Sequence, residues 1–328
     1  MKHLAAHYLA SLDSSNAASG TKTRYRRTVE LKIVPALGGL RLRELSSGKF
    51  TAAITIEAKR SPSEAKIMRA VCNGMMRFAL IHDAVNTNHA HGAALDLKDP
   101  NKKEPRALTP EDAIGLFDLI DAARAASRPG PVVRKGLDDL RDALLLGLAT
   151  GLRISEITAI HEEDIIWEDP VRVKIHRANV YQEGTGQKIG PGHWEHPGGQ
   201  VIQPHTKTKD RRLVAVDEFG SAILKRRLGD LGQNGLLFWA RGTRGPVSLN
   251  NMRRVLRRVT GETALDFVST HTMRRSLATE VERVLGVEVA QKVLAHGELS
   301  TTIRGYIARE TTTPDVREIS RKFGRADN

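Results

Sequence analysis

A short polar segment, residues 98–106, constrains the fold more than any other feature, because it divides the chain in two. Its sequence, KDPNKKEPR, contains two prolines and no large apolar side chain, which is typical of a linker. The chain has 328 residues, which is long enough for two domains. We therefore expect one domain over residues 1–97 and a second over residues 107–328, joined at 98–106.

Residues 1–97 have the apolar spacing of a helical bundle. Leu4, Tyr8 and Leu12 each follow the last by four residues, and further helices are expected over residues 21–33, 46–56 and 61–81. The helix over 21–33 is expected to end at Pro35 and the glycine pair after it, because proline lacks the N–H that a helix needs. This helix carries a basic stripe: Lys22, Arg24, Arg26, Arg27 and Lys32.

Residues 107–328 mix helical and strand patterns. Thr109 and Pro110 suit the N-cap and first turn of a helix, and residues 171–175 alternate apolar and polar side chains like a strand. Residues 201–204 and 213–216 are expected as strands around a turn at 207–211, and residues 183–199 as a Gly-rich loop. Further helices are expected over 136–150, 218–230, 248–259, 271–285, 287–295 and 299–309. The predicted fold class is mainly α (α+β): a helical bundle, then a mixed helical domain with a small antiparallel β-sheet.

The charge balance favours a polyanionic partner. Lys and Arg number 51 against 38 Asp and Glu, a formal net charge of +13, and each phosphate that a cation contacts releases counterions. No run of about 18 apolar residues is present and the N-terminus does not resemble a signal peptide, so no membrane partner is expected. The single cysteine, Cys72, lies in an apolar run. These features favour a cytoplasmic, nucleoid-associated protein.

Two distant segments each place an arginine among apolar residues. Arg153 lies within ATGLRISEI, residues 149–157, and Arg274 within HTMRRSLAT, residues 271–279. A guanidinium in such surroundings needs an anionic partner, and two of them are suited to the oxygens of one phosphate. Taken singly, Arg153 would be interpreted as a helix-end arginine paired with Glu156, and Arg274 as part of a solvated basic face.

Five short segments, taken in order, resemble the motifs of the tyrosine recombinases, the family that includes the phage integrases. Thr150-Gly151-Leu152-Arg153 followed by Glu156 resembles the first motif. The other four are the lysine segment Thr206-Lys207-Thr208, the pair His271 and Arg274, the segment Leu294-Ala295-His296, and the nucleophile segment from Ser300 to Tyr306. Only one of the four tyrosines, Tyr306, follows His271.

The resemblance implies an enzyme that cleaves and rejoins duplex DNA. Arg153 and Arg274 would stabilise the charge on the non-bridging phosphate oxygens, and Tyr306 would attack to form a covalent 3′-phosphotyrosine. His271 is also a candidate to accept the phenol proton. No metal, ATP or other cofactor is expected. Lys207 would protonate the leaving 5′ oxygen. His271 and His296 would donate hydrogen bonds to the phosphate, and Glu156 would support the arginines.

The sequence departs from the family pattern near the nucleophile. Tyr306 stands ten residues after His296 where nine is usual, and a bulge at Gly305 would absorb the extra residue. Lys209 would share a strand face with Lys207, so spacing cannot choose between them and the family pattern selects Lys207. Two smaller departures are Ala295 in place of a glycine and Arg275 where His or Lys is common.

A histidine-rich stretch invites a zinc interpretation. Its members are His193, Glu195, His196 and His205, but their spacing fits no closed ligand set and no cysteine lies nearby. We therefore expect no metal site there.

The basic residues expected to contact DNA lie on two helices. Residues 23–27 and 33–38 resemble, more loosely, the family's core-binding domain. The additional arm-binding domain that some integrases carry is not expected ahead of Met1. The second helix is expected near residues 248–259. The candidate DNA contacts are Arg24, Arg26, Arg27, Arg253, Arg254 and Arg257, which would position the protein on phosphates.

The resemblance also implies partners. These are double-stranded DNA with specific recombination sites, a homotetramer on synapsed DNA from a free monomer, and an accessory directionality or DNA-bending factor. The tail, residues 311–328, is expected to pack on a neighbouring protomer. Besides an integrase of a mobile element, three functions stay open: a chromosome-dimer or plasmid resolving recombinase, a type IB topoisomerase, and a non-catalytic DNA-binding protein.

Overall fold

The computed structural model describes residues 1–91, 106–127, 131–182, 184, 188–190, 193–194, 198–206, 211–294, 311–312 and 315–324. The chain forms two compact units. One comprises Met1–Glu104 and Gln182–Pro197, and the other Pro105–Tyr181 and Gly198–Asn328. The linker expected at 98–106 falls almost wholly outside the described residues.

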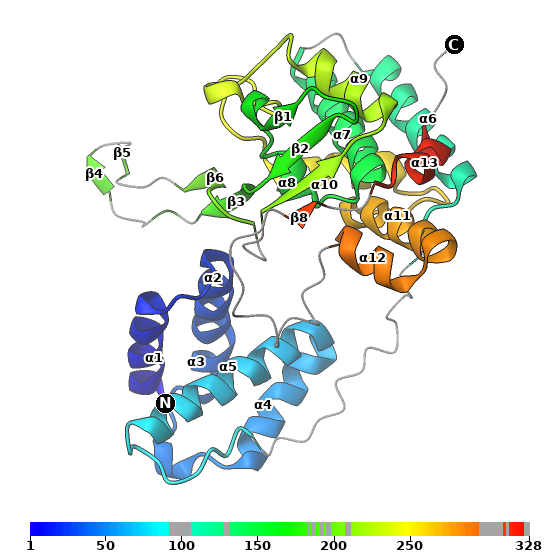
Figure 1. Ribbon diagram of the computed structural model, residues 1–328. Coiled ribbons are helices and arrows are strands. Elements are labelled where there is room, and N and C mark those ends of the chain that lie inside the picture. The colour runs from blue at the N-terminus through cyan, green and yellow to red at the C-terminus, as the bar shows by residue number, and fades with distance from the viewer. Residues whose placement is uncertain are drawn as a thin grey trace. The chain divides into compact units, whose positions relative to one another are not determined.

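The first unit is a bundle of helices around one core (Figure 1). Its longest helix, α5 (Pro62–Ile81), packs against α1 (Lys2–Ser14), α2 (Ser19–Thr28) and α4 (Ser47–Arg60). Ser46 and Ser61 cap α4 and α5 as side-chain acceptors, which is why these helices begin where they do. The shorter elements are η1 (Val29–Ile33), α3 (Val34–Leu37) and η2 (Leu42–Glu44).

The helix expected to end at Pro35 in fact runs through it. α2 continues into the π-helical turn η1 and then into α3, which carries Pro35 in its first turn. Within the π turn the Val34 N–H donates to the Val29 carbonyl, five residues back. A proline ring clashes with the carbonyl four residues before it, and a wider turn ahead of the ring accommodates it without breaking the helix.

The second unit is organised around one central helix, α7 (Pro131–Thr150). Leu140, Leu144 and Leu148 on α7 are fully buried, and α7 contacts most of the unit's other helices. Thr109 caps α6 as predicted, its hydroxyl accepting from the Asp112 N–H at 3.1 Å. The other helices are α6 (Pro110–Ala126), α8 (Ile154–Ile157), η3 (Glu162–Asp164), α9 (Glu218–Arg227), η4 (Gln233–Gly235), α10 (Leu249–Thr260), α11 (Thr270–Leu285), α12 (Val287–Leu294), α13 (Arg317–Ser320) and η6 (Arg321–Phe323).

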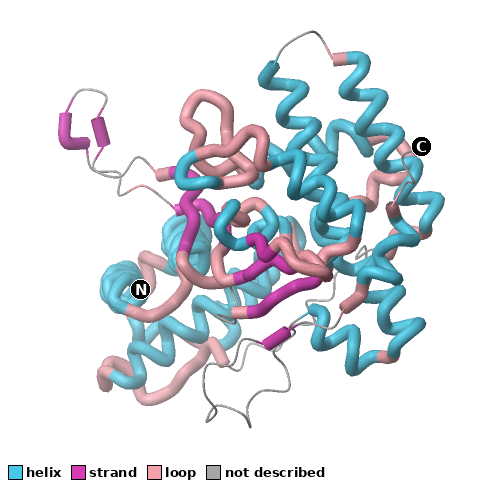
Figure 2. The backbone as a smooth tube through the Cα atoms, turned by 45° about the horizontal axis from the view of Figure 1, so that its top comes forward, coloured by secondary structure: helices cyan, strands magenta, loops and turns pink. Residues whose placement is uncertain are grey.

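A four-stranded sheet lies in the second unit (Figure 2). Its order is β1 (Ile165–Ile166), β2 (Arg172–Ile175), β7 (Arg212–Ala215) and β8 (Thr311–Thr312). The first two pairings are antiparallel, and the short β8 joins β7 in parallel. A mainly helical fold with a small, largely antiparallel sheet is what the sequence predicts, and this prediction is confirmed.

The strands expected to flank the turn at 207–211 do not pair with each other. Within the described residues β6 (Gly199–Gln203) pairs with β3 (Ala178–Gln182), whereas β7 pairs with β2. Val173 and Val214, opposite each other in β2 and β7, are both buried, while every residue of β6 is half-buried. β7 therefore pairs with β2 because the apolar side chains of both strands are buried in the same core.

The stretch expected as a loop over 183–199 contains a small hairpin. β4 (Lys188–Gly190) pairs antiparallel with β5 (His193–Trp194), with a register shift between Lys188 and Gly190. Alternation is too short to be recognised in segments of three and two residues. The last predicted helix, over 299–309, lies outside the described residues.

The described part of the C-terminal segment packs on its own unit, and the expected packing of the tail on a neighbouring protomer stays a prediction. Val316 and Ile319 are buried in a cluster with Leu277 and Val281 of α11. The buried Ser320 hydroxyl donates to the Asp217 carboxylate at 2.6 Å. Over residues 315–324 the apolar face of this segment is therefore covered by the chain itself.

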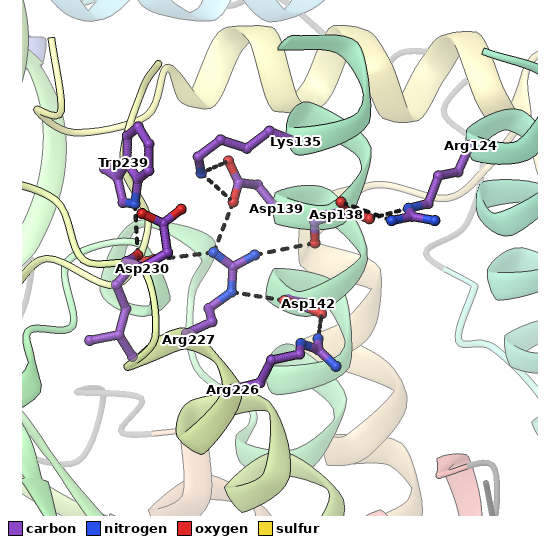
Figure 3. A network of polar contacts seen from close by, with 10 residues as sticks. Arg124, Lys135, Asp138, Asp139, Asp142, Arg226, Arg227, Asp230 and Trp239 are labelled. Carbon is purple, nitrogen blue, oxygen red and sulfur yellow. Dashed lines mark hydrogen bonds and ion pairs between the residues drawn. The ribbon is translucent and has the colours of Figure 1, made fainter. Parts of the chain in front are cut away.

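A network of ion pairs joins α7 to α9 (Figure 3). At its centre the Arg227 guanidinium donates to Asp139 and Asp142, each at 2.8 Å. Lys135 and Arg226 pair with the same two carboxylates. No helix in the described part of the chain is both long and apolar enough to cross a membrane.

Candidate active site

The site begins where α7 ends. Gly151 adopts a φ of +67°, the left-handed conformation that closes a helix and favours glycine. A Cβ at this position would also stand 3.2 Å from Leu277 Cδ2 of α11. The Thr150 hydroxyl donates to the Leu146 carbonyl at 2.5 Å and accepts from the Leu152 N–H at 3.3 Å. Threonine and glycine thus turn the chain sharply and bring Arg153 to the start of α8.

Arg153 is held by Glu156 in two ways. The Arg153 N–H donates to Glu156 Oε2 at 3.0 Å, and Arg153 Nη1 donates to Oε1 at 2.8 Å. Burial alone would raise the pKa of Glu156, but the Arg212 and Arg153 cations and the Arg153 N–H together lower it. Glu156 is therefore an ionised, buried carboxylate that contacts Arg153.

Arg274 reaches the same turn from α11, 123 residues later in the chain. Its Nη1 donates to the Gly151 carbonyl at 2.6 Å, and only 5% of the residue is exposed. Burial, then the positive charge of Arg153, lowers the pKa of Arg274 to about 10, so the guanidinium stays charged at neutral pH. The two arginines that the sequence singled out are thus brought together.

His271 lies in the first turn of α11, one helical turn before Arg274. Its ring is exposed to solvent, yet partial desolvation and the cations Arg274, Arg153 and Arg253 all lower its pKa. The imidazole is therefore neutral at pH 7 and able to accept a proton. Arg275, its other basic neighbour, points elsewhere and donates to the Arg106 carbonyl at 3.2 Å.

Arg212 is a site residue that the sequence analysis missed. From β7 its Nη2 donates to Glu156 Oε2 at 2.8 Å, and it is almost fully buried. A signal was present, because Arg212 and Val214 share one face of a strand and Val214 faces the core. A cation on the apolar face of a strand marks a buried charge.

Three of the predicted site residues cannot be placed. Lys207, His296 and Tyr306 lie outside the described residues, as do Lys209, Ala295 and Gly305. Of the histidine-rich stretch, Glu195 and His196 are likewise outside, and the part of the chain that is described holds no group of three metal-ligating side chains.

The arginines expected to contact DNA differ in their engagement. On α2, Arg24 pairs with Glu64 at 3.0 Å and Arg26 with Asp13 at 2.6 Å, whereas Arg27 is exposed with no ion pair to a described residue. On α10, Met252 and Leu256 face the core and the arginines lie on the other side. The three α10 arginines that are predicted DNA contacts form no ion pair with a carboxylate among the described residues; they are Arg253, Arg254 and Arg257.

A mainly helical unit in which a buried and a partly buried guanidinium converge beside a neutral imidazole has the features of a phosphate-binding enzyme site. Comparison with known proteins identifies the family. Residues 118–312 match the phage integrase family, and residues 1–94 match the phage integrase central domain. The first match covers more than half of the chain, so the chain belongs to the phage integrase family.

Two curated relatives match part of the chain. The probable integrase/recombinase YoeC of Bacillus subtilis (strain 168) is 28% identical over 109 residues, 33% of this chain and 60% of that protein. The tyrosine recombinase XerC of Bifidobacterium longum subsp. infantis is 25% identical over 211 residues, 62% of this chain and 51% of that protein. The chain thus spans between half and two thirds of the length of these relatives.

Solved structures share the fold. A Tn1549 transposon integrase in complex with transposon right end DNA superposes with a TM-score of 0.70 at 14% identity, covering 93% of this chain and 94% of that one. A lambda integrase dimer bound to a COC′ core site gives 0.60 at 18% identity, covering 94% and 98%. A lambda integrase tetramer bound to a Holliday junction gives 0.60 at 18%, covering 91% and 78%.

Proposed function

We propose that the protein is a site-specific DNA recombinase that cleaves and rejoins duplex DNA through a covalent 3′-phosphotyrosine at Tyr306, as an integrase of a mobile element. The observation that carries the proposal is the convergence of Arg153 and Arg274 at the Gly151 turn. Family membership supports it, since Thr150–Arg153 and His271–Arg274 are the segments that resemble the family's motifs.

The charges of the site suit phosphoryl transfer. Within the part of the chain that the structure describes, Arg153, Arg274 and Arg212 outnumber the carboxylate of Glu156, and this excess of positive charge suits an anion. As a phosphodiester is attacked, charge grows on its non-bridging oxygens, and preorganised cations stabilise that charge. The two convergent guanidiniums are in place before the substrate arrives, so little reorganisation is needed.

The proton transfers are assigned to His271 and Lys207. The pKa of His271 lies below its usual value, so the neutral ring accepts the phenol proton of Tyr306 as the phenolate attacks phosphorus. The P–O bond to the 5′ oxygen breaks, and Lys207 supplies the proton to that oxygen. His296 donates a hydrogen bond to the phosphate. The phosphotyrosine conserves the energy of the bond, so rejoining needs no cofactor.

The sheet supports the placement of the nucleophile. Thr311 stands five residues after Tyr306 and pairs with Arg212 of β7. Five residues span at most about 18 Å, and Arg212 contacts Glu156 beside Arg153. A connection of five residues is therefore long enough for Tyr306 to reach the arginines, which supports its proposed role.

The proposed partner is double-stranded DNA with specific recombination sites. Structures of relatives with the same fold contain DNA: an integrase with transposon end DNA, and lambda integrase as a dimer on a core site and a tetramer on a Holliday junction. We infer a monomer that assembles into a tetramer on synapsed DNA, with an accessory directionality or DNA-bending factor. A cytoplasmic, nucleoid-associated location follows from this partner.

The test traps the covalent intermediate. Duplexes selected from a random-sequence pool by binding to the protein are resynthesised with a nick beside each candidate cleavage position, so that the released strand end diffuses away. The wild type is expected to accumulate a protein–DNA adduct that survives denaturation. Tyr306→Phe should bind equally well without forming it, and the exposed Tyr181→Phe serves as the matched control.

The same experiment separates the alternatives. Binding without any adduct in the wild type would indicate a non-catalytic DNA-binding protein. Relaxation of a supercoiled plasmid that lacks the selected sites would indicate a type IB topoisomerase. Resolution of two sites on one plasmid, with no joining of separate plasmids, would favour a dimer-resolving recombinase over an integrase.

A further inference from the structure

Arg212 occupies a central position in the sheet. It lies in β7, opposite Ile175 of β2 on one side and Thr311 of β8 on the other. The segment before it contains Lys207, and the segment before β8 contains Tyr306. The strand that carries Arg212 therefore adjoins, in sequence or by pairing, both segments that the proposed chemistry requires.

The Arg212 side chain is buried but only partly bonded. It is 4% exposed, and its Nη2 donates to Glu156 Oε2 at 2.8 Å. Its Nε and Nη1 have no hydrogen-bond partner among the described residues. Buried polar groups are normally satisfied, so a guanidinium with two unpaired donors needs an explanation.

Fold stability does not supply that explanation. A buried ion pair is often replaced by apolar residues with no loss of stability, because taking both charges out of water is unfavourable. Arg212 shares its face of β7 with Val214, where an apolar side chain would complete the core. The cation is better explained by what it does to Glu156.

Glu156 connects Arg212 to Arg153. Its Oε2 accepts both from Arg212 Nη2 and from the Arg153 backbone N–H, and its Oε1 accepts from Arg153 Nη1. With Arg212 in place, the carboxylate plane is fixed from two sides. Without it, Oε2 keeps one donor, and the carboxylate is free to turn and to carry the Arg153 guanidinium with it.

We propose that Arg212 is a positioning residue: it holds Glu156, and through Glu156 it sets the orientation in which Arg153 meets the phosphate. The inference rests on the proposed recombinase function and adds a residue to it. Arg212 acts through another side chain, so its loss should slow the cleavage step and leave DNA affinity nearly unchanged. Residues that support a site from behind its ligands typically change activity 10–100-fold.

The test measures single-turnover cleavage of the nicked duplex, DNA affinity and thermal stability for matched variants. Arg212→Met is expected to cleave about 10–100-fold more slowly than the wild type, with the dissociation constant for DNA nearly unchanged. Arg212→Lys should recover part of the rate, because an ammonium can keep the single contact to Oε2. Arg211→Met, at the exposed neighbouring position, is the control and should cleave at the wild-type rate.

A double-mutant cycle shows whether Arg212 acts through Glu156. In the Glu156→Gln background, Arg212→Met should cause little further loss of rate, because the contact it served is already weakened. Independent losses that multiply would overturn the proposed route. If Arg212→Met does not fold, Arg212→Gln carries the test, because its neutral amide removes the charge from the contact to Oε2, and cleavage at the wild-type rate would overturn the inference.

The outcomes distinguish this inference from the proposed function. A wild type that forms no adduct at Tyr306 overturns both. An adduct formed as fast by Arg212→Met as by the wild type overturns the role of Arg212 alone. A fall in rate that is matched by an equal fall in DNA affinity or in the folded fraction would likewise reduce Arg212 to a structural residue.

Discussion

The ion-pair network between α7 and α9 makes a sharp prediction about stability (Figure 3). Arg227→Met removes the central guanidinium but keeps an unbranched apolar stem. In the folded protein Arg227 donates to Asp139 and Asp142 at 2.8 Å each, and to the Leu237 carbonyl at 3.1 Å. The guanidinium also stacks over the Phe238 ring at 4.0 Å. Its side chain is 10% exposed, so the lost contacts lie in a poorly solvated region.

The magnitude follows from what stays behind. Breaking a buried ion pair by removing one partner costs about 3–5 kcal/mol, because the other charge is left uncompensated. Lys135 still pairs with Asp139 at 2.9 Å, and Arg226 still pairs with Asp142 at 2.5 Å. The remaining cations place Arg227→Met near the lower end, about 3 kcal/mol. For a domain of this size that corresponds to a fall in Tm of about 6–12 °C.

Differential scanning calorimetry of the full chain measures this shift in the transition of the unit that contains α7. Arg226→Met is the matched control, because Arg226 contacts the same Asp142 from a side chain that is 61% exposed. An exposed ion pair is worth at most about 1 kcal/mol, so the control should lose less than about 4 °C. Equal shifts for the two variants would refute the reasoning that burial sets the energy of this network.

Three further predictions concern the turn, the tail and the basic helix. Gly151→Ala should lower the free energy of unfolding by about 1–2 kcal/mol, because its φ of +67° is costly for alanine. Gly136→Ala in α7, where a Cβ meets nothing within 4 Å, should raise the free energy of unfolding by about 0.5–1 kcal/mol. Chemical denaturation measures both variants. A loss of stability in both would contradict the special role of the Gly151 backbone conformation. The pKa of Glu280 is lowered to about 2 by hydrogen bonds from Arg283 and Lys322, so its contribution to stability is present above the ordinary pKa of 4.5 and is lost as pH falls towards 2. Denaturation at a series of pH values should therefore show wild type and Glu280→Gln converging at low pH, and a constant difference would argue against the ion pairs. Arg257→Ala on α10 should reduce the slope of log DNA affinity against log salt concentration by about 0.9, as expected for one lost phosphate contact. The control Arg124→Ala on α6 should leave this slope unchanged. Unchanged slopes for both variants would show that Arg257 makes no phosphate contact.

Local signals in the sequence account for much of the fold. Side-chain caps are local, so Ser61 and Thr109 mark the starts of α5 and α6 correctly. Pro35 misleads, because its effect depends on whether the turn before it can widen, and that depends on packing. Strand partners are a matter of tertiary packing too: β6 and β7 are close in sequence, yet each pairs with an earlier strand.

Some residues of the candidate site could likewise be predicted from the sequence, and one could not. Arg153 and Arg274 stand out because each interrupts an apolar run and belongs to a known motif, and the structure brings both to the Gly151 turn. Arg212 belongs to no motif that the sequence analysis used. The role of Arg212 depends on its contact with Glu156, 56 residues away, and only the folded chain shows that contact.

The balance of charge at the turn argues for an anion as the natural complement of the site. Among the described residues Arg153, Arg212 and Arg274 surround one carboxylate, Glu156, and all but Arg153 are almost fully buried. Like charges this close oppose one another, which is why burial and Arg153 together lower the pKa of Arg274. A chain selected for stability alone would remove one cation or add a second acid. Retaining the excess is consistent with a site that reaches electrostatic balance when a phosphate enters it, and the cations lower the energy of the transition state most because that state carries the most negative charge.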